Sequence, residues 1–212
     1  MPALDDDALT ALWSIYDASG VRPEYLIPVL YFESAGSFDP SIQNQAGAPY
    51  FGLAQTSGAK LAALGTTPAA FLAMTQGAQI RFAVAPYFAG VVKNYGPIRS
   101  ATRAEQANFE PATLGRVRYL SQVIEWKGSR AYADNAKALD PLRHGAITLG
   151  DLSIVMGRAS KAPPVKSAIA RAYMLRPDAA PAHDPVYGDD FVSPAWSIGI
   201  LALAVGWGIR GF

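Results

Sequence analysis

Apolar residues recur at intervals of three and four along most of this chain, and no segment shows sustained alternation of apolar and polar residues. Such spacing places the apolar side chains on one face of a helix, whereas alternation would indicate a half-buried strand. The pattern predicts helices over residues 5–18, 25–34, 52–64, 68–88, 102–109, 112–125, 129–138 and 148–157. We therefore expect an all-α, mainly helical fold without internal repeats.

Composition limits the classes of protein to which the chain can belong. Half of its 212 residues are hydrophobic, which is enough for one domain with a real core but short for two. The 18 basic and 17 acidic side chains leave a formal net charge of +1. No global field attracts the protein to nucleic acid, so no nucleic-acid partner is predicted.

The residue types available for catalysis are few. The chain has no cysteine, which excludes disulfides, thiolate metal sites and a cysteine nucleophile. Its two histidines, His144 and His183, are far apart and each stands beside turn residues, so a histidine-based zinc site or a Ser-His triad would be hard to build. We expect no cofactor and no metal, and we expect catalysis to depend on carboxylate side chains.

One carboxylate lies within a segment that is otherwise mostly apolar. Glu33 lies near the C-terminal end of the mostly apolar segment YLIPVLYFES, residues 25–34, which is predicted to be a buried helix with Pro28 in its first turn. Residues 35–52 follow and are dense in Gly, Pro, Asn, Ser and Asp, which predicts a long irregular loop. Long loops within a compact domain are often functional.

The segment FESAGSFDPSIQNQAGAPYFGLAQTS, residues 32–57, resembles the catalytic signature of the lytic transglycosylase and lysozyme-like family. The matching elements are Glu33-Ser34, Phe38-Asp39-Pro40, Gly47-Ala48 and Gly52-Leu53-Ala54-Gln55. Residues 64–88, 108–115 and 132–152 are also similar to pieces of phage-type members, so the resemblance covers roughly residues 24–157. The chain departs from the family in a longer loop, in Ala54, where a larger apolar residue is usual, and in lacking a Tyr-Asn-Ala-Gly segment.

The resemblance implies a lysozyme-like catalytic domain over residues 1–157 that cleaves the β-1,4 bond between N-acetylmuramic acid and N-acetylglucosamine in peptidoglycan. In that family one glutamate, here Glu33, serves as acid and then as base, and the sugar's acetamido group stabilises the cation, which gives 1,6-anhydromuramic ends. The implied substrate-side residues are Ser34, Phe51, Gly52, Leu53 and Gln55. An apolar wall would keep Glu33 protonated near neutral pH, and its candidates are Leu30, Tyr31, Phe32 and Phe51.

Two alternatives remain open at this stage. A hydrolytic, endolysin-like muramidase would need a second carboxylate, and Glu105, Glu110 and Asp39 are its candidates. A lysozyme-like domain kept as a non-catalytic structural part of a virus particle would need none, and the longer loop and the missing tyrosine segment motivate that reading.

Residues 140–151 carry the glycine, the isoleucine and the acidic end of a calcium-binding loop at matching offsets. Leu142 and His144, however, occupy positions where calcium needs oxygen ligands. We therefore interpret this segment as a turn.

The C-terminal part differs in composition from the rest. Residues 158–190 segregate basic from acidic side chains among prolines, which predicts a linker with one short helix at Val165–Leu175. Within the apolar tail, residues 191–212, the stretch from Phe191 to Ile209 lacks charge and has tryptophans near both ends, which favours a membrane anchor over a buried helix or a contact with other virion proteins.

The N-terminal sequence lacks the pattern of a secretory signal, although the implied substrate lies outside the cytoplasmic membrane. A phage particle would supply the carrier. We expect a virion-associated enzyme acting on the host cell wall during entry, with release through a holin at lysis as the competing setting.

Overall fold

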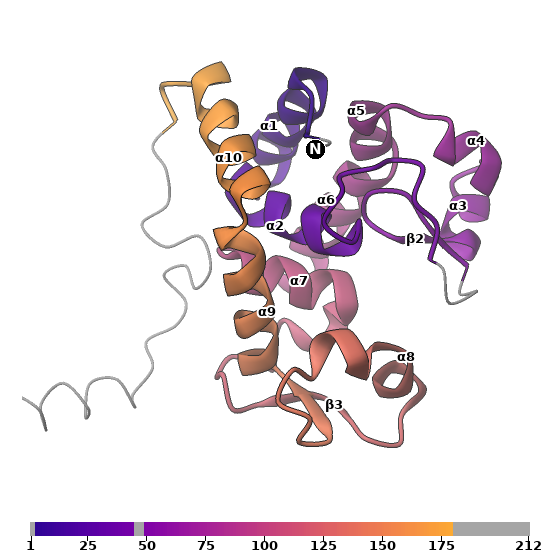
Figure 1. Cartoon of the computed structure of the whole chain (residues 1–212), viewed down its shortest axis with the longest axis vertical. Coiled ribbons are helices and arrows are strands. Elements are labelled where there is room, and N and C mark those ends of the chain that lie inside the picture. Colours follow the sequence, from indigo (N-terminus) through magenta and orange to yellow (C-terminus); the bar gives the residue numbers. More distant parts are fainter. Residues whose placement is uncertain (1–2, 45–48, 180–212) are drawn as a thin grey trace, which may run out of the picture.

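The computed structural model describes residues 3–44 and 49–179 of the chain. This part is mainly helical, and four short strands form two small antiparallel pairs (Figure 1). The elements are α1 (Asp6–Ser19), α2 (Pro23–Glu33), β1 (Tyr50–Phe51), β2 (Thr56–Ser57), α3 (Gly58–Ala63), α4 (Pro68–Leu72), α5 (Gln76–Gln79), a π-helical turn (Ile80–Val84), α6 (Ala85–Tyr95), α7 (Ala101–Phe109), a 3₁₀ turn (Pro111–Thr113), β3 (Val123–Trp126), α8 (Arg130–Leu139), β4 (Ala146–Thr148), α9 (Leu149–Lys161) and α10 (Pro163–Leu175).

Helix α2 is the centre of the fold. Its residues from Pro23 to Leu30 are all buried, and it packs against α1, α7, α9 and α10. A helix that is apolar on every side must be surrounded, because no face of it gains from contact with water. The functional consequence is that the last turn of α2, which contains Glu33, is held in a fixed place by four neighbouring helices.

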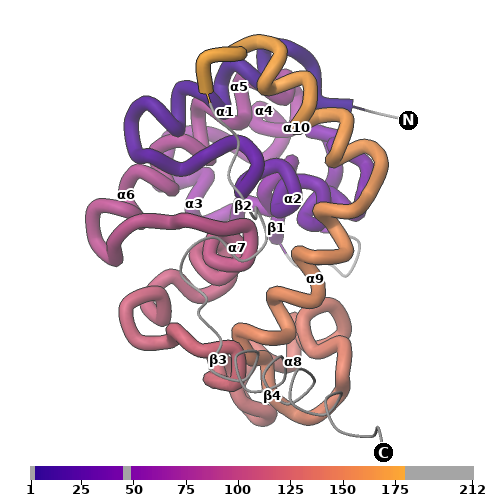
Figure 2. Tube along the Cα trace, turned by 90° about the vertical axis from the view of Figure 1, so that its left-hand side faces the viewer, coloured from indigo at the N-terminus to yellow at the C-terminus, as the bar shows by residue number. Residues whose placement is uncertain are grey.

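A second part of the molecule lies below α7 in Figure 1 and is built from the β3–β4 pair and α8. Helix α9 begins directly after β4 and runs from this part up to α10 (Figure 2). The start of α9 is fixed by Thr148, whose side chain accepts from the backbone N–H of Asp151 while the Asp151 carboxylate accepts from the backbone N–H of Thr148. This reciprocal cap satisfies two backbone donors that would otherwise lack partners.

Residues 76–95 form one long helix that is interrupted by the π-helical turn at Ile80–Val84. Pro86 lies just after this turn, within the first residues of α6. A proline has no N–H to donate, and its ring crowds the carbonyl four residues earlier, so a locally widened turn relieves the clash. The predicted helix over 68–88 is thus divided into α4, α5, the π turn and α6, with Thr67 and Thr75 capping the first two.

The predicted helix over 112–125 is wrong. This segment contains the 3₁₀ turn, an irregular stretch and strand β3. Arg103 on α7 is buried, and its guanidinium donates to the backbone carbonyl oxygens of Leu114, at 2.9 Å, and Val117, at 2.5 Å. These two carbonyl oxygens accept hydrogen bonds from the buried guanidinium of Arg103. In a continuing helix they would instead accept from backbone N–H groups, and the buried cation would lose these partners.

Pro28 is also placed differently from the prediction. Helix α2 begins at Pro23, so Pro28 lies inside the helix rather than in its first turn. The true first turn is occupied by Pro23, which is well suited to that position because the N–H it lacks would have no helical partner.

Residues 158–175, predicted as the first part of a linker, are helical and packed. They complete α9 and form α10, and α10 packs against α1, α2 and α9. The indole N–H of Trp13 donates to the backbone oxygen of Ala172 at 2.8 Å, and the ring of Tyr173 meets the same indole edge to face at 5.5 Å. The basic residues that suggested a linker lie on the outer side, where Arg176 pairs with Asp17 at 2.6 Å.

The predicted apolar tail, residues 191–212, lies outside the described residues, as does the end of the predicted linker from residue 180. Within residues 3–44 and 49–179, no helix combines the length and the hydropathy that crossing a membrane requires.

Candidate functional site

Glu33 is the last residue of α2, and the turn that follows it is unusually constrained. Ser34 is completely buried, and its hydroxyl donates to the carbonyl of Leu30 at 2.7 Å while it accepts from the backbone N–H of Phe38 at 2.9 Å. Ala35 and Phe38 both adopt the left-handed backbone conformation, with φ of 51° and 52°. Non-glycine residues are strained in this region and persist there when the surrounding structure enforces it, most often at functional sites.

The carboxyl group of Glu33 lies in surroundings of low polarity. Removal from water raises its pKa from 4.5 to about 7, because a charged carboxylate loses hydration there. The side-chain amide of Asn108 donates to Glu33 Oε1 at 2.8 Å, which favours the charged form and partly opposes the rise in pKa. Glu33 as a whole residue is only partly buried, although its carboxyl group is removed from water.

A second carboxyl group lies beside the first. Glu105 stands three residues before Asn108 on α7, so both side chains lie on the face of α7 that packs against α2. Glu105 is 1% exposed, and its pKa is raised well above 4.5, first by burial and then by the negative charge of Glu33. Within the described part of the chain, neither of its carboxyl oxygens has a hydrogen-bond partner. Two neighbouring acids in a dry site do not both ionise, so Glu105 is neutral when Glu33 is charged.

Helix α7 is locked in place by the buried Arg103, which also donates to Gln106 Oε1 at 2.6 Å. The amide of Gln106 donates in turn to the hydroxyl of Thr113 at 2.8 Å. This buried network fixes the rotation of α7 about its axis, and so it fixes the direction in which Glu105 and Asn108 face.

The tract from Phe51 to Gln55 is positioned chiefly by one side chain of α5. The amide of Gln79 is completely buried, accepts from the backbone N–H of Leu53 at 3.0 Å and donates to the carbonyl oxygens of Pro40 and Phe71 at 2.7 and 2.9 Å. Three separate segments are thereby joined by a single amide group.

This arrangement gives the predicted substrate-side residues a structural role. Phe51 lies in a small apolar cluster with Leu61, Phe71 and Ala83. Leu53 is completely buried, and Gln55 adopts a left-handed backbone with φ of 45° and donates its amide to the carbonyl of Gly52 at 2.9 Å. The structure therefore holds Ser34, Phe51 and Leu53 inside the protein, while Gln55 remains partly accessible.

Gly52 is the position where only glycine fits. Its φ is 71°, and a Cβ atom would stand 2.4 Å from Gln79 Oε1 and 2.7 Å from the ring of Phe71. The need for glycine thus comes from the approach of Gln79 and Phe71 as well as from the backbone conformation.

A cation is held near α7 by an aromatic ring. The ammonium group of Lys60 lies 3.4 Å from the centre of the Tyr87 ring, and partial burial lowers the pKa of Lys60 to about 8. The hydroxyl of Tyr87 donates at 2.6 Å to the backbone oxygen of Ala107, the residue before Asn108. The hydroxyl of Tyr87 therefore links this cation–aromatic pair to the backbone of α7.

A pocket of about 480 Å³ opens beside the end of α2. Phe32 and Ala35 form one wall, and Val155, Arg158 and Ala159 of α9 form the other, while Glu33 itself is not among the lining residues. The lining is mostly apolar with one cationic group, a composition that suits an amphipathic ligand.

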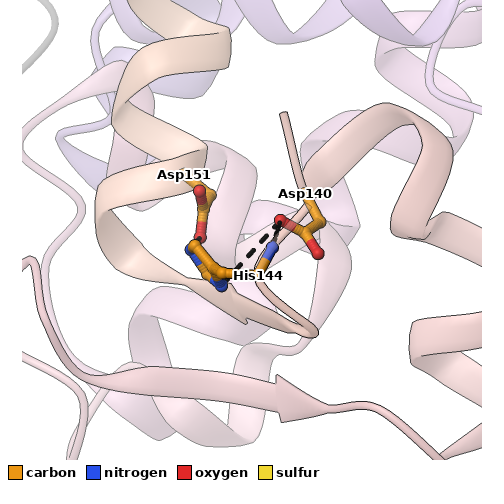
Figure 3. Close-up of side chains that lie close together, drawn as sticks. All are labelled: Asp140, His144 and Asp151. Atoms are coloured by element: carbon orange, nitrogen blue, oxygen red, sulfur yellow. Dashed lines mark hydrogen bonds and ion pairs between the residues drawn. The ribbon is translucent and has the colours of Figure 1, made fainter. Parts of the chain in front are cut away.

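Outside this region, Asp140, His144 and Asp151 come together between α8 and α9 (Figure 3). The imidazole of His144 lies between the two carboxylates, with Nε2 3.1 Å from Asp151 and Nδ1 3.9 Å from Asp140. Each of the three can offer one ligand atom, and these atoms lie within 4.8 Å of one another. Among the described residues, this is the group that could hold a metal ion.

Four polar side chains bond to Glu33, lie beside it or hold the segments around it in place: Asn108, Gln79, Arg103 and Glu105. Of these, the sequence indicated only Glu105, as one of three candidates for a second carboxylate. Asn108 and Gln79 are ordinary helix residues whose partners are 75 and 26 residues away. The available signal was polarity on helices otherwise rich in alanine, which is weak by itself.

The chain was compared with protein-family models, with curated proteins and with solved structures, and none of the three comparisons found a match.

Proposed function

We propose that this protein cleaves the β-1,4 glycosidic bond between N-acetylmuramic acid and N-acetylglucosamine in peptidoglycan, as a transglycosylase on a lysozyme-like fold. The observation that carries the proposal is the placement of the Glu33 carboxyl group at the end of the buried helix α2, where it accepts from Asn108 at 2.8 Å and where burial raises its pKa to about 7. A general acid works best when its pKa lies near the working pH, because it then both holds and releases its proton readily.

In the proposed reaction Glu33 donates its proton to the bridging oxygen as the glycosidic bond breaks. The sugar's acetamido group stabilises the positive charge that develops at the anomeric carbon. The carboxylate of Glu33 then accepts the proton of the 6-hydroxyl group, whose oxygen bonds to that carbon. No water is consumed, and the products are a free 4-hydroxyl end and a 1,6-anhydromuramic end.

The candidates for a second carboxylate favour this single-acid mechanism. Glu105 is next to Glu33 but almost fully buried, so it is poorly placed to activate a water molecule from solvent. Asp39 accepts hydrogen bonds from both the backbone N–H and the hydroxyl of Ser41, which lower its pKa. Its carboxylate therefore stabilises the turn of its own loop. We infer that Glu105 instead keeps the surroundings of Glu33 neutral.

We propose that the pocket beside α2 takes a part of the glycan strand that flanks the cleaved bond, since Glu33 is not among its lining residues. Its apolar lining can cover sugar and alanine faces, and Arg158 can pair with a carboxylate of the substrate. The predicted roles of Ser34, Phe51, Gly52 and Leu53 then become indirect, because these residues shape the loop, while Gln55 keeps the proposed contact with the substrate.

The test is digestion of purified murein followed by mass spectrometry of the soluble products. We expect anhydromuramic ends from the wild-type chain and a rate about two to four orders of magnitude lower for Glu33→Gln, the usual contribution of a general acid or base. Gln keeps an oxygen that can accept from Asn108, so folding should persist. Glu125→Gln is the matched control, because Glu125 is a partly buried carboxylate on β3 to which no role in the reaction is assigned.

Three outcomes would contradict the proposal or part of it. Reducing muramic ends would replace the transglycosylase by a hydrolytic muramidase. Retained cleavage in a folded Glu33→Gln protein would move the acid to another carboxylate. Absence of cleavage by folded wild-type protein between pH 4 and 9 would favour a structural role for the domain.

The biological setting that we propose is a phage particle that opens the host cell wall during entry. The proposal rests on the resemblance to phage-type enzymes, and the apolar stretch at 191–212 would attach the protein to a membrane or to other virion proteins. Detection of the protein in purified particles by mass spectrometry tests this setting, and its presence only in lysates of infected cells would favour a lysis role.

A further inference from the structure

The loop between α8 and α9 brings two buried carboxylates to one imidazole. Asp140 follows the last residue of α8 and is 4% exposed, and Asp151 lies in the first turn of α9 and is 1% exposed. The side chain of His144, 40% exposed, stands between them and closes the cluster toward solvent (Figure 3). Nothing in the proposed glycosidase reaction uses these groups.

The loop is built like a calcium-binding loop. Asp140 is its first residue and accepts from the backbone N–H groups of His144 and Gly145 at 3.2 and 3.0 Å. Gly145 is its sixth and has a left-handed backbone with φ of 85°. Asp151 is its twelfth and lies in the exit helix. A helix, a twelve-residue loop with glycine at the sixth position and a second helix are the frame in which proteins hold calcium.

The ligands themselves do not suit calcium. Calcium takes six to eight oxygen ligands, and the loops that bind it supply side-chain oxygens at the third and fifth positions. Here these positions are Leu142, which is 63% exposed, and His144, which offers nitrogen. One imidazole with two carboxylates is a donor set that zinc and similar transition-metal ions prefer.

We propose that Asp140, His144 and Asp151 form a binding site for one divalent transition-metal ion of the zinc type. His144 Nε2 and Asp151 Oδ2 are 3.1 Å apart, and all three ligand atoms lie within 4.8 Å of one another. Ligand atoms around tetrahedral zinc are about 3.3 Å apart. Asp140 faces the other ring nitrogen of His144, at 3.9 Å, so its carboxylate has to move toward Asp151 and His144 Nε2 before all three side chains bind one ion.

Burial and charge support this assignment. The second oxygen of Asp151, Oδ1, is buried and has no hydrogen-bond partner within the described part of the chain. A divalent ion bound by Asp140 and Asp151 would directly offset the negative charge of these two buried carboxylates.

The neighbouring cations restrict how the ion can bind. Lys127, Lys137 and Arg143 line, together with Asp140, a pocket of about 350 Å³. Their positive charge disfavours a loosely held, hydrated cation near that pocket. The same positive charge opposes a directly coordinated ion, so coordination by the three side chains has to outweigh this repulsion.

The experiment is calorimetric titration of the full-length, chelator-treated protein with zinc chloride, together with thermal unfolding in the presence and absence of zinc. We expect one equivalent of zinc to bind and to raise the unfolding temperature, because the ion joins the α8–α9 loop to the start of α9. Cobalt(II) should give the visible absorption of a four-coordinate site. Calcium should not compete at equal concentration.

The variants use the fact that the chain has two histidines. His144→Gln should weaken zinc binding by at least about 100-fold, since it removes a direct ligand, while His183→Gln should leave it unchanged. His144→Asp replaces nitrogen by oxygen at the fifth loop position, so it should weaken zinc binding and improve calcium binding. Circular dichroism of each variant without metal checks that the fold is retained.

The proposal is overturned if the wild-type chain binds no zinc, or if His144→Gln binds it as the wild type does. Loss of zinc binding in His183→Gln alone would place the site elsewhere. Calcium binding by the wild type at the affinity of zinc would contradict the choice of metal. None of these readouts depends on murein cleavage, so failure here is distinguishable from failure of the proposed function.

Discussion

The side-chain amide of Asn108 on α7 lies 2.8 Å from Oε1 of Glu33 at the end of α2. This contact joins residues 75 positions apart and is the direct polar link between the proposed acid and the helix that carries Glu105. Its electrostatic effect is to stabilise the carboxylate, so it holds the pKa of Glu33 below the value that burial alone would give.

Asn108→Ala should therefore raise the pKa of Glu33 above about 7. The acid form would persist to higher pH, and the alkaline limb of the pH profile of murein cleavage should move upward. Asn135→Ala is a suitable control, because its amide donates to a backbone carbonyl on the distant α8. A downward shift of the alkaline limb in Asn108→Ala would contradict the role assigned to this hydrogen bond.

Glu33→Gln should change how stability depends on pH. The folded-state pKa of Glu33, about 7, is above the ordinary value of 4.5 for a glutamate, so between these pH values the folded protein holds a proton that the unfolded chain has released. The wild type thus loses stability as pH rises from about 4.5 to about 7, and the Gln variant lacks this loss. Chemical denaturation at pH 4.5 and pH 8 should show the variant gaining on the wild type at the higher pH. An unchanged difference would mean that Glu33 is well hydrated.

Gly52→Ala should destabilise the protein by about 3 kcal/mol or more, the sum of left-handed strain and overpacking. Its Cβ would approach Gln79 Oε1 and the ring of Phe71 to less than 3 Å. Gly65→Ala is the matched control, since its φ of 77° is similar but no atom lies within 4 Å of the added Cβ. We expect about 1–2 kcal/mol there. If denaturant titrations showed the same loss of unfolding free energy in Gly52→Ala and Gly65→Ala, the side chain of Gln79 would be able to move away from the added Cβ at little cost.

Ala168→Asp should cost about 3 kcal/mol or more, because it buries a charge between α10 and the rest of the core. Ala170→Asp lies on the exposed side of the same helix and should change stability by less than about 1 kcal/mol. Thermal unfolding of both variants tests whether α10 is part of the domain. If both were harmless, residues 158–175 would behave as the linker that their charge pattern suggested.

Most of the helices, and the apolar surroundings of Glu33, could be predicted from the sequence because their signals are local. Apolar spacing predicted α1, α2, α7, α8 and α9 within a few residues, and the apolar run before Glu33 predicted its burial. Helix α10 was only half recognised, because its buried face consists of Val165, Ala168 and Ala172, which are too small to mark a core helix between so many charges.

The remaining features depend on contacts between distant segments. Arg103 is of a type that is rarely buried, and nothing near it in the sequence indicates that the carbonyls of Leu114 and Val117 will surround it. The β3–β4 pair was missed for a related reason, because β3 is irregular between Val123 and Glu125 and so shows no alternating pattern.

The packing of α10 on α1 bears on the order of folding events. The bond from Trp13 to Ala172 closes a loop of 159 residues, and the contacts of Arg171 with Leu4 and of Arg176 with Asp17 close loops of similar size. Closing long loops is entropically costly and slow compared with forming local helices. During synthesis, the face of α1 that packs against α10 therefore stays exposed until α10 has left the ribosome. Until then the indole of Trp13 is open to binding by chaperones and to self-association.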